Sequence, residues 1–215
     1  MNPIIKLYQK KIGDAFAELS KYARPGGIVF LGDSITEFFR ANEFFPGAYV
    51  INRGIGSDTT EGVLCRLPES VYDLSPSKVF ILIGTNDIAE KKSEQNIIGN
   101  MWEIITQIQE NCPDTQIYLE SICPVSLEKS KKIKRGYLGA RNNEIISSIN
   151  EKLKIMANEK GITYIDLYSY LINEEGNICL DYTVEGLHLS ICGYHKVAEI
   201  LMPYVMGESQ TTNKI

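Results

Sequence analysis

The stretch IVFLGDSIT, residues 28–36, decides the fold class of this chain. Its first four residues form a short apolar run, which is typical of a strand buried in a parallel sheet. Similar runs occupy residues 48–51, 78–83, 116–119 and 163–165, and helical periodicity marks residues 4–19, 59–72, 95–111, 141–160 and 193–206. Alternating strands and helices predict an α/β protein, a three-layer α/β/α sandwich around a five-stranded parallel sheet.

The length and composition agree with one domain. The chain has 215 residues, 44% of them hydrophobic, and single domains commonly reach this size. We expect residues 1–27 to form an N-terminal helix packed on a domain of residues 28–206, followed by a polar tail at residues 207–215. The formal net charge of −5 argues against a nucleic-acid binder that works through a basic face.

The cysteines and the apolar runs bear on metal binding, redox activity and the cellular compartment. Five scattered cysteines include no CxxC pair, which argues against a zinc ribbon or a redox centre. No signal peptide and no run near the ~20 apolar residues of a membrane span is recognisable, so we expect a cytoplasmic protein without membrane insertion. We expect no cofactor and no metal, and the sequence leaves open whether the protein forms a homo-oligomer.

Small and polar residues follow several predicted strands, where open α/β sheets bind their ligands. Residues 32–34 (GDS) follow the first strand, residues 52–60 the second and residues 84–87 (GTND) the third, while residues 185–188 (EGLH) precede the last helix. Together they offer a serine, a base with an acid, and candidate oxyanion donors. These are the groups that nucleophilic acyl transfer requires.

Ser34 and the two histidines focus this prediction. Ser34 lies where a strand passes into a helix, so its N–H can face a developing oxyanion, although Asp33 or Ser34 could instead simply cap that helix. His188 and His195 are the only histidines. We expect His195 to be an exposed residue of the last helix and His188 to be the base, with Glu185 three residues before it.

These four blocks, in this order, resemble the GDSL/SGNH hydrolase family, which includes GDSL-type lipase/acylhydrolases and the catalytic subunits of platelet-activating-factor acetylhydrolase. The resemblance runs from about residue 28 to residue 206 and implies a flavodoxin-like SGNH hydrolase fold. It implies Ser34 as nucleophile, His188 as base, Glu185 as acid, and the N–H groups of Ser34 and Ser57 with the Asn86 side chain as the oxyanion hole. We expect Asp33 and Asn52 to support the site through hydrogen bonds.

Two residues depart from the family pattern. Ser57 stands where the family carries a glycine, which costs of order 1–2 kcal/mol if the position needs a positive φ but keeps the backbone N–H. Glu185 stands in place of an aspartate. Because Ser-His-Glu triads occur in hydrolases, we expect Glu185 to be the acid, with Asp181 as the alternative.

The resemblance implies a serine esterase that acts on a small-molecule ester. Short acyl groups, above all acetyl, are favoured because no long apolar lid is visible. One alternative is acyl transfer to a sugar or another alcohol, and another is a non-catalytic binding module with a drifted triad. We expect Arg53 and the basic run at residues 129–135 to be solvated.

Overall fold

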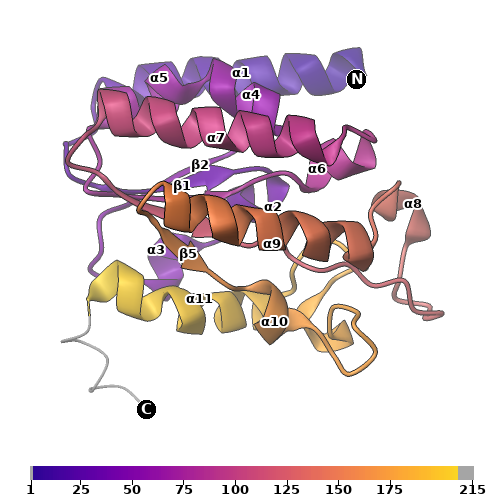
Figure 1. The fold of residues 1–215 in the computed structure, drawn as a ribbon. Coiled ribbons are helices and arrows are strands. Elements are labelled where there is room, and N and C mark those ends of the chain that lie inside the picture. The colour runs from indigo at the N-terminus through magenta and orange to yellow at the C-terminus, as the bar shows by residue number, and fades with distance from the viewer. Residues whose placement is uncertain (1, 208–215) are drawn as a thin grey trace.

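A five-stranded parallel sheet forms the centre of the protein (Figure 1). A computed structural model describes residues 2–207, so the predicted tail lies, beyond Gly207, outside the described residues. The strands lie in the order β2-β1-β3-β4-β5, which is the flavodoxin-like doubly wound order and confirms the predicted fold class. Their bounds are β1 (Ile28–Gly32), β2 (Val50–Gly54), β3 (Lys78–Leu82), β4 (Gln116–Glu120) and β5 (Thr163–Ile165).

Helices cover both faces of this sheet. Neighbouring strand residues point to opposite faces, so Val29 and Leu31 enter one apolar core while Ile28 and Phe30 enter the other. The first core is closed by α4, α5, α7 and α9, and the second by α2, α3, α10 and α11. The helices are α1 (Pro3–Ser20), α2 (Ser34–Glu37), α3 (Ala41–Phe44), α4 (Thr60–Cys65), α5 (Leu67–Ser70), α6 (Thr85–Ala89), α7 (Glu94–Asn111), α8 (Arg135–Leu138), α9 (Asn143–Glu159), α10 (Tyr168–Leu171) and α11 (Ile191–Met206), with 3-10 turns at Tyr72–Leu74 and Leu180–Tyr182.

The first helix, α1, packs against α5, outside the sheet (Figure 1). It begins where the Asn2 side chain accepts a hydrogen bond from the N–H of Ile4 (2.9 Å). Near its end, Ser20 Oγ donates to the carbonyl of Glu69 (2.8 Å). The amphipathic pattern at the N-terminus therefore forms a helix that is bound to the rest of the protein.

The prediction for Arg53 is wrong, because this side chain is buried rather than solvated. Its guanidinium lies over the ring of Phe16 on α1, with 4.5 Å between guanidinium carbon and ring centroid. Burial, with the charge of Arg66 nearby, lowers the pKa of Arg53 to about 10. The covering helix is distant in sequence, so the local pattern around Arg53 could not reveal its burial.

One strand and one helix have bounds that differ from the predicted ones. The second strand is Val50–Gly54 rather than residues 48–51, so Asn52 lies within the strand and not after it. The helix expected over residues 59–72 divides into α4, α5 and a 3-10 turn. Arg66 leaves the helical conformation (φ −119°), and Pro68 has no N–H with which to continue the helix.

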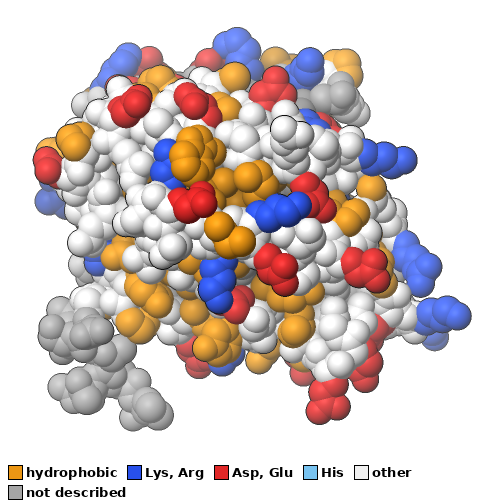
Figure 2. All heavy atoms as spheres, viewed as in Figure 1, with side chains coloured by type: hydrophobic (Ala, Val, Ile, Leu, Met, Phe, Trp, Pro, Cys, Tyr) orange, Lys and Arg blue, Asp and Glu red, His pale blue; other side chains and the backbone are white. Residues whose placement is uncertain are grey.

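The basic run at residues 129–135 is exposed, as expected. The five basic residues of the 129–135 run are exposed, and Lys and Arg side chains at the lower right edge of Figure 2 lie over this part of the chain. Within residues 2–207, no helix has the length and apolarity needed to cross a membrane. Nor does any group of three or more His, Cys, Asp and Glu side chains there come together as a set of metal ligands.

Candidate active site

The structure brings Ser34, His188 and Glu185 into one chain of contacts. Ser34 Oγ lies 3.0 Å from Nε2 of His188, and Nδ1 of His188 lies 2.5 Å from Oε1 of Glu185. A carboxylate only accepts hydrogen bonds, so Nδ1 carries the proton of the neutral ring and Nε2 accepts the Ser34 hydroxyl. This arrangement is suited to removing the proton of a serine nucleophile.

Residues 183–188, here called the histidine loop, set this geometry locally. Oε1 of Glu185 also accepts the backbone N–H of His188 (3.1 Å), which fixes the carboxylate against its own loop. Thr183 Oγ1 accepts the N–H of Gly186 (2.8 Å) and donates to the carbonyl of His188 (2.9 Å). Gly186 has a φ of +106°, a backbone conformation that residues other than glycine rarely adopt.

The other two candidates near this loop lie elsewhere. Asp181 is exposed on the Leu180–Tyr182 turn, where its backbone carbonyl accepts Ser190 Oγ (2.5 Å). The loop therefore places the carboxylate of Glu185, and not that of Asp181, on His188. His195 is exposed on α11, 3.6 Å from Glu199, as expected.

Asp33 and Asn52 hold the segment around Ser34. Asp33 Oδ1 accepts the N–H of Ile35 (2.9 Å), so Asp33 caps α2 and leaves Ser34 as the first residue of that helix. Burial raises the pKa of Asp33 to about 7. Asn52 donates from β2 to the carbonyls of Thr36 (2.7 Å) and Phe39 (3.1 Å), which ties α2 to the sheet.

The four residues 55–58 form a tight turn, here called the 55–58 turn. It is closed by a hydrogen bond from the N–H of Asp58 to the carbonyl of Ile55 (3.2 Å). Ser57 has a φ of +60° and Gly56 has no positive φ, so the turn has type II geometry with serine at the position that favours glycine. Within residues 2–207, the backbone N–H groups of Ser57 and Ser34 bond to no acceptor.

Asn86 contacts the same turn from α6. Its Nδ2 donates to the carbonyl of Asp58 (2.8 Å), and its Oδ1 accepts Nη2 of Arg141 (2.6 Å). Arg141 is buried and also donates to Thr85 Oγ1 (2.8 Å), so it fixes which way the amide of Asn86 points. With the oxygen on Arg141, the NH₂ group of Asn86 faces the turn.

Two arginines in this region, Arg66 and Arg141, were missed in the sequence. Arg66 Nε binds Oδ2 of Asp58 (2.7 Å), while its Nη1 and Nη2 donate to the carbonyls of Arg53 and Gly32 (both 2.9 Å). Both arginines lie in stretches whose apolar residues have helical spacing, where a charged residue normally faces solvent. Helical spacing gives no signal for their burial, because Gly32 and Thr85, which they contact, lie on other segments of the chain.

Two exposed aromatic side chains border the site. The ring of Phe38 lies 5.5 Å from the His188 ring and that of Tyr137 lies 6.4 Å from it, measured between centroids. Phe38 is 52% exposed and Tyr137 59% exposed. A substrate that reaches Ser34 would therefore meet aromatic surface beside the imidazole.

Comparisons of the sequence and of the structure with known proteins point to the same group of proteins. Residues 30–196 match the model of the GDSL-like Lipase/Acylhydrolase family. Platelet-activating factor acetylhydrolase IB subunit alpha2 of Homo sapiens is 24% identical over 197 residues, which cover 86% of this chain and 81% of that protein. A Streptococcus pneumonia structure assigned as a platelet activating factor has a TM-score of 0.87 at 30% identity, with 94% of each chain covered. A GDSL-like lipase of Bacteroides thetaiotaomicron has a TM-score of 0.73 at 25% identity, covering 94% of this chain and 97% of that one.

Proposed function

The chain belongs to the GDSL-like lipase/acylhydrolase family and is a hydrolase, and from that premise we propose that it is a serine esterase for short acyl esters. The observation that carries the proposal is the chain of contacts from Ser34 through His188 to Glu185. A serine hydroxyl is a weak nucleophile by itself, and a hydrogen-bonded imidazole backed by a carboxylate is the usual means of activating it.

In the first half of the reaction, Ser34 Oγ attacks the ester carbonyl carbon while Nε2 of His188 takes the hydroxyl proton. Glu185 stabilises the imidazolium that forms. The N–H groups of Ser34 and Ser57 and the NH₂ group of Asn86 meet the oxyanion, and each such donor typically contributes about 3 kcal/mol. The C–O bond to the alcohol then breaks, and His188 returns its proton to the leaving oxygen.

In the second half, water replaces the alcohol. His188 removes a proton from the water as it attacks the acyl group on Ser34. The second tetrahedral intermediate collapses with the proton returned to Ser34 Oγ, which releases the carboxylic acid and restores the enzyme. These residues carry both half-reactions, and the proposal calls on no cofactor.

Acetyl esters are the first substrates to try. The Homo sapiens relative is named an acetylhydrolase, which supports an acetyl group at this site as well. The alcohol portion leaves from the side of the His188 imidazole, so the exposed rings of Phe38 and Tyr137 would lie beside it. A series of p-nitrophenyl esters from acetate to palmitate tests this preference, and kcat/KM should fall as the acyl chain lengthens.

The nucleophile is tested with purified protein, p-nitrophenyl acetate and a fluorophosphonate probe. The wild-type chain should hydrolyse the ester and be labelled, while Ser34→Ala should lose labelling and activity by a factor of order 10⁴–10⁶. The proposal would be wrong if neither reagent reacted or if Ser34→Ala hydrolysed the ester as fast as the wild type. Added alcohols or sugars test the alternative of acyl transfer, because a transferase would convert them to esters in preference to releasing the acid.

A further inference from the structure

On the basis of the proposed function, we infer that Gln9 of α1 is a positioning residue for the oxyanion hole. Its side chain holds the peptide between Gly56 and Ser57 in the orientation that presents the Ser57 N–H to the oxyanion. The contact is a hydrogen bond of 3.2 Å from Nε2 of Gln9 to the carbonyl oxygen of Gly56. Gln9 lies outside residues 30–196, the span that matches the family model.

The geometry of the peptide bond links this contact to the site. A trans peptide directs its carbonyl and its N–H in opposite directions, so the carbonyl of Gly56 and the N–H of Ser57 turn together. Because Gln9 binds the carbonyl, the N–H is directed away from α1. The turn is bonded on its other side to the end of β1, through Ile55 N–H and the carbonyl of Gly32 (3.1 Å), and β1 leads directly into Ser34.

Serine at position 57 makes such an anchor necessary. Type I and type II turns differ in the orientation of their central peptide, and only type II requires a positive φ at the third residue. Glycine adopts that φ without cost, whereas serine prefers the negative φ of type I. With Ser57 at a φ of +60°, the preference of the residue opposes the orientation that the structure adopts. The hydrogen bond from Gln9 acts against that preference.

Neighbouring contacts join α1 to the nucleophile as well. The hydroxyl of Tyr8 donates to the carboxylate of Glu37, which lies on α2 one turn after Ser34. A Cβ atom on Gly56 would lie 3.0 Å from Oε2 of Glu37 and 3.5 Å from Cε1 of Tyr8. The side chains of Tyr8 and Glu37 therefore pack closely against Gly56, beside the hydrogen bond of Gln9.

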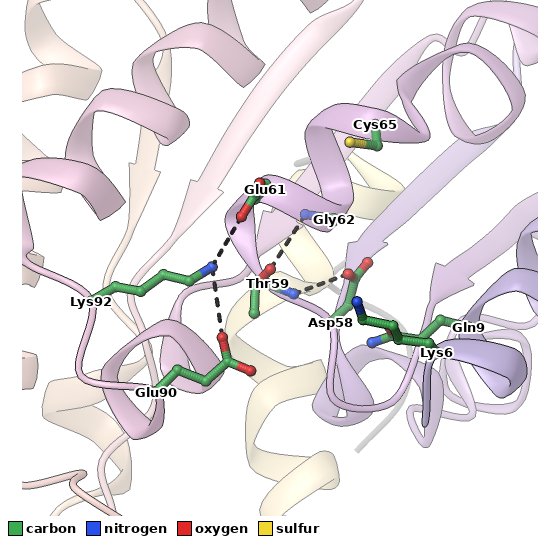
Figure 3. Close-up of a pocket in the computed structure, with 9 residues that line it drawn as sticks. All are labelled: Lys6, Gln9, Asp58, Thr59, Glu61, Gly62, Cys65, Glu90 and Lys92. Atoms are coloured by element: carbon green, nitrogen blue, oxygen red, sulfur yellow. Dashed lines mark hydrogen bonds and ion pairs between the residues drawn. The ribbon is translucent and has the colours of Figure 1, made fainter. Parts of the chain in front are cut away.

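Gln9 is accessible to mutation without disturbing a packed core. It is half-buried at the edge of an open cavity of about 650 Å³, where Figure 3 shows it with Lys6 beside Asp58. Gln9→Met keeps the length of the side chain and removes its donor. The adjacent Lys10 is exposed and pairs with Asp14, so Lys10→Met is a matched control on the same helix.

The test is a double-mutant cycle of Gln9→Met and Ser57→Gly, measured by the hydrolysis of p-nitrophenyl acetate. Gln9→Met alone should lower kcat about tenfold with little change in KM. The change weakens the bond between the Ser57 N–H and the oxyanion, and that bond forms only in the transition state. This loss of kcat is smaller than the loss expected when an oxyanion donor is removed, because without Gln9 the turn still adopts, part of the time, the orientation that directs the Ser57 N–H to the oxyanion. In the Ser57→Gly background, Gln9→Met should lower kcat less than about threefold, because glycine adopts the positive φ of the turn without help from Gln9. Lys10→Met should leave both constants unchanged.

Two results would overturn the inference: an unchanged kcat in Gln9→Met, or an equal loss with and without Ser57→Gly. A purely structural role would lower the melting temperature equally in both backgrounds and would not be rescued by glycine. If Gln9→Met fails to fold, Gln9→Glu replaces it at pH 8, because an ionised carboxylate keeps the length and presents no donor. Failure of the proposed function is a separate result, in which the wild type reacts with neither the ester nor the probe or the esterase activity survives Ser34→Ala.

Discussion

The histidine loop contacts Ser34 and the 55–58 turn is bonded to the end of the strand that precedes it, but the two are built in different ways. In the histidine loop, the acid binds the base three residues away, and Thr183 and Glu185 close the loop with bonds inside residues 183–188. The 55–58 turn has one internal hydrogen bond and is held by Arg66, Asn86 and Gln9, which come from three other helical segments. One half of the site is local in sequence and the other is assembled from distant parts of the chain.

This difference predicts how each region responds to change. The carbonyls of Glu185 and Gly186 accept the N–H groups of Lys134 and Ser126, but the side-chain bonds that orient His188 are self-contained, so the function of the loop should depend mainly on the residues within it. A turn held from outside depends also on residues beyond it, and two of these, Arg66 and Gln9, are not among the groups proposed to contact the substrate. The proposed base and acid should therefore be sensitive to mutation in the loop itself, and the proposed oxyanion donors to mutation far away.

The largest effect is expected inside the histidine loop. Glu185→Ala should lower kcat for p-nitrophenyl acetate by a factor of order 10³–10⁴, because His188 loses the carboxylate that sets its tautomer and stabilises its charge. Asp181→Ala is the matched control in the same region and should change kcat less than about twofold, as expected of an exposed surface residue. The opposite ranking would make Asp181 the acid and would contradict a self-contained loop.

The next effect is expected at the donor that contacts the turn. Asn86→Ala removes an NH₂ group that we propose to meet the oxyanion, so kcat should fall by a factor of about 10²–10³. KM should change little if this donor acts only in the transition state. A rise in KM with an unchanged kcat would show that Asn86 binds the ground state instead.

A smaller effect is expected from Arg141, which contacts Asn86 but not the substrate. Arg141→Met leaves Oδ1 of Asn86 without its partner, and the loss of buried hydrogen bonds should lower the free energy of unfolding by about 1–3 kcal/mol. Urea unfolding measures this, and kcat should fall as the amide loses its fixed direction. Arg135→Met, an exposed arginine near the same site, is the control, and an equal loss there would remove the special role of Arg141.

The last prediction concerns the pH dependence of stability rather than activity, at Asp33, the buried carboxyl next to Ser34. Its pKa of about 7 lies above the value near 4 of an unfolded chain. Between these pH values the folded protein keeps a proton that the unfolded chain has lost. The contribution of Asp33 to the free energy of unfolding therefore falls as pH rises from about 4 to about 7, by up to about 1.4 kcal/mol per pH unit.

Asp33→Asn isolates this dependence. Asparagine also caps helices, so the hydrogen bond to Ile35 can remain while the titration disappears. Both proteins are unfolded in urea between pH 4 and pH 8. The free energy of unfolding of the variant, relative to that of the wild type, should rise until about pH 7 and then stay constant. Parallel curves throughout the range would show that Asp33 does not keep its proton in the folded protein.

The parts of the molecule that could be predicted from sequence are those set by short-range patterns. Apolar runs indicated all five strands, although β2 was placed too early because residues 52–54 are polar or lack a side chain. The spacing of Glu185 and His188 predicted their contact, since three residues suffice to form it. Ser34 is proposed as the nucleophile because it lies where the first strand passes, through Asp33, into a helix.

The parts that could not be predicted depend on side chains that meet only after folding. Arg66 and Arg141 look like solvent-facing residues of helices, yet both are buried against backbone carbonyls and polar side chains of other segments. Burial of Arg53 required the ring of Phe16, and the contact of Gln9 required α1 to cross the turn. Hydrophobic periodicity reports which face of an element is covered, and it does not identify the polar partners across that contact.

The position of α1 has a consequence for evolution and engineering by recombination. A segment exchanged at the edges of the family match, residues 30–196, would carry the serine, the histidine and the glutamate into a new host but leave Gln9 and Tyr8 behind. Because position 57 lies within this segment, a segment with glycine there could be accepted directly, whereas one with serine would also need a compatible first helix in the recipient. On this reasoning, positions 9 and 57 should be inherited as a pair, although 47 residues separate them.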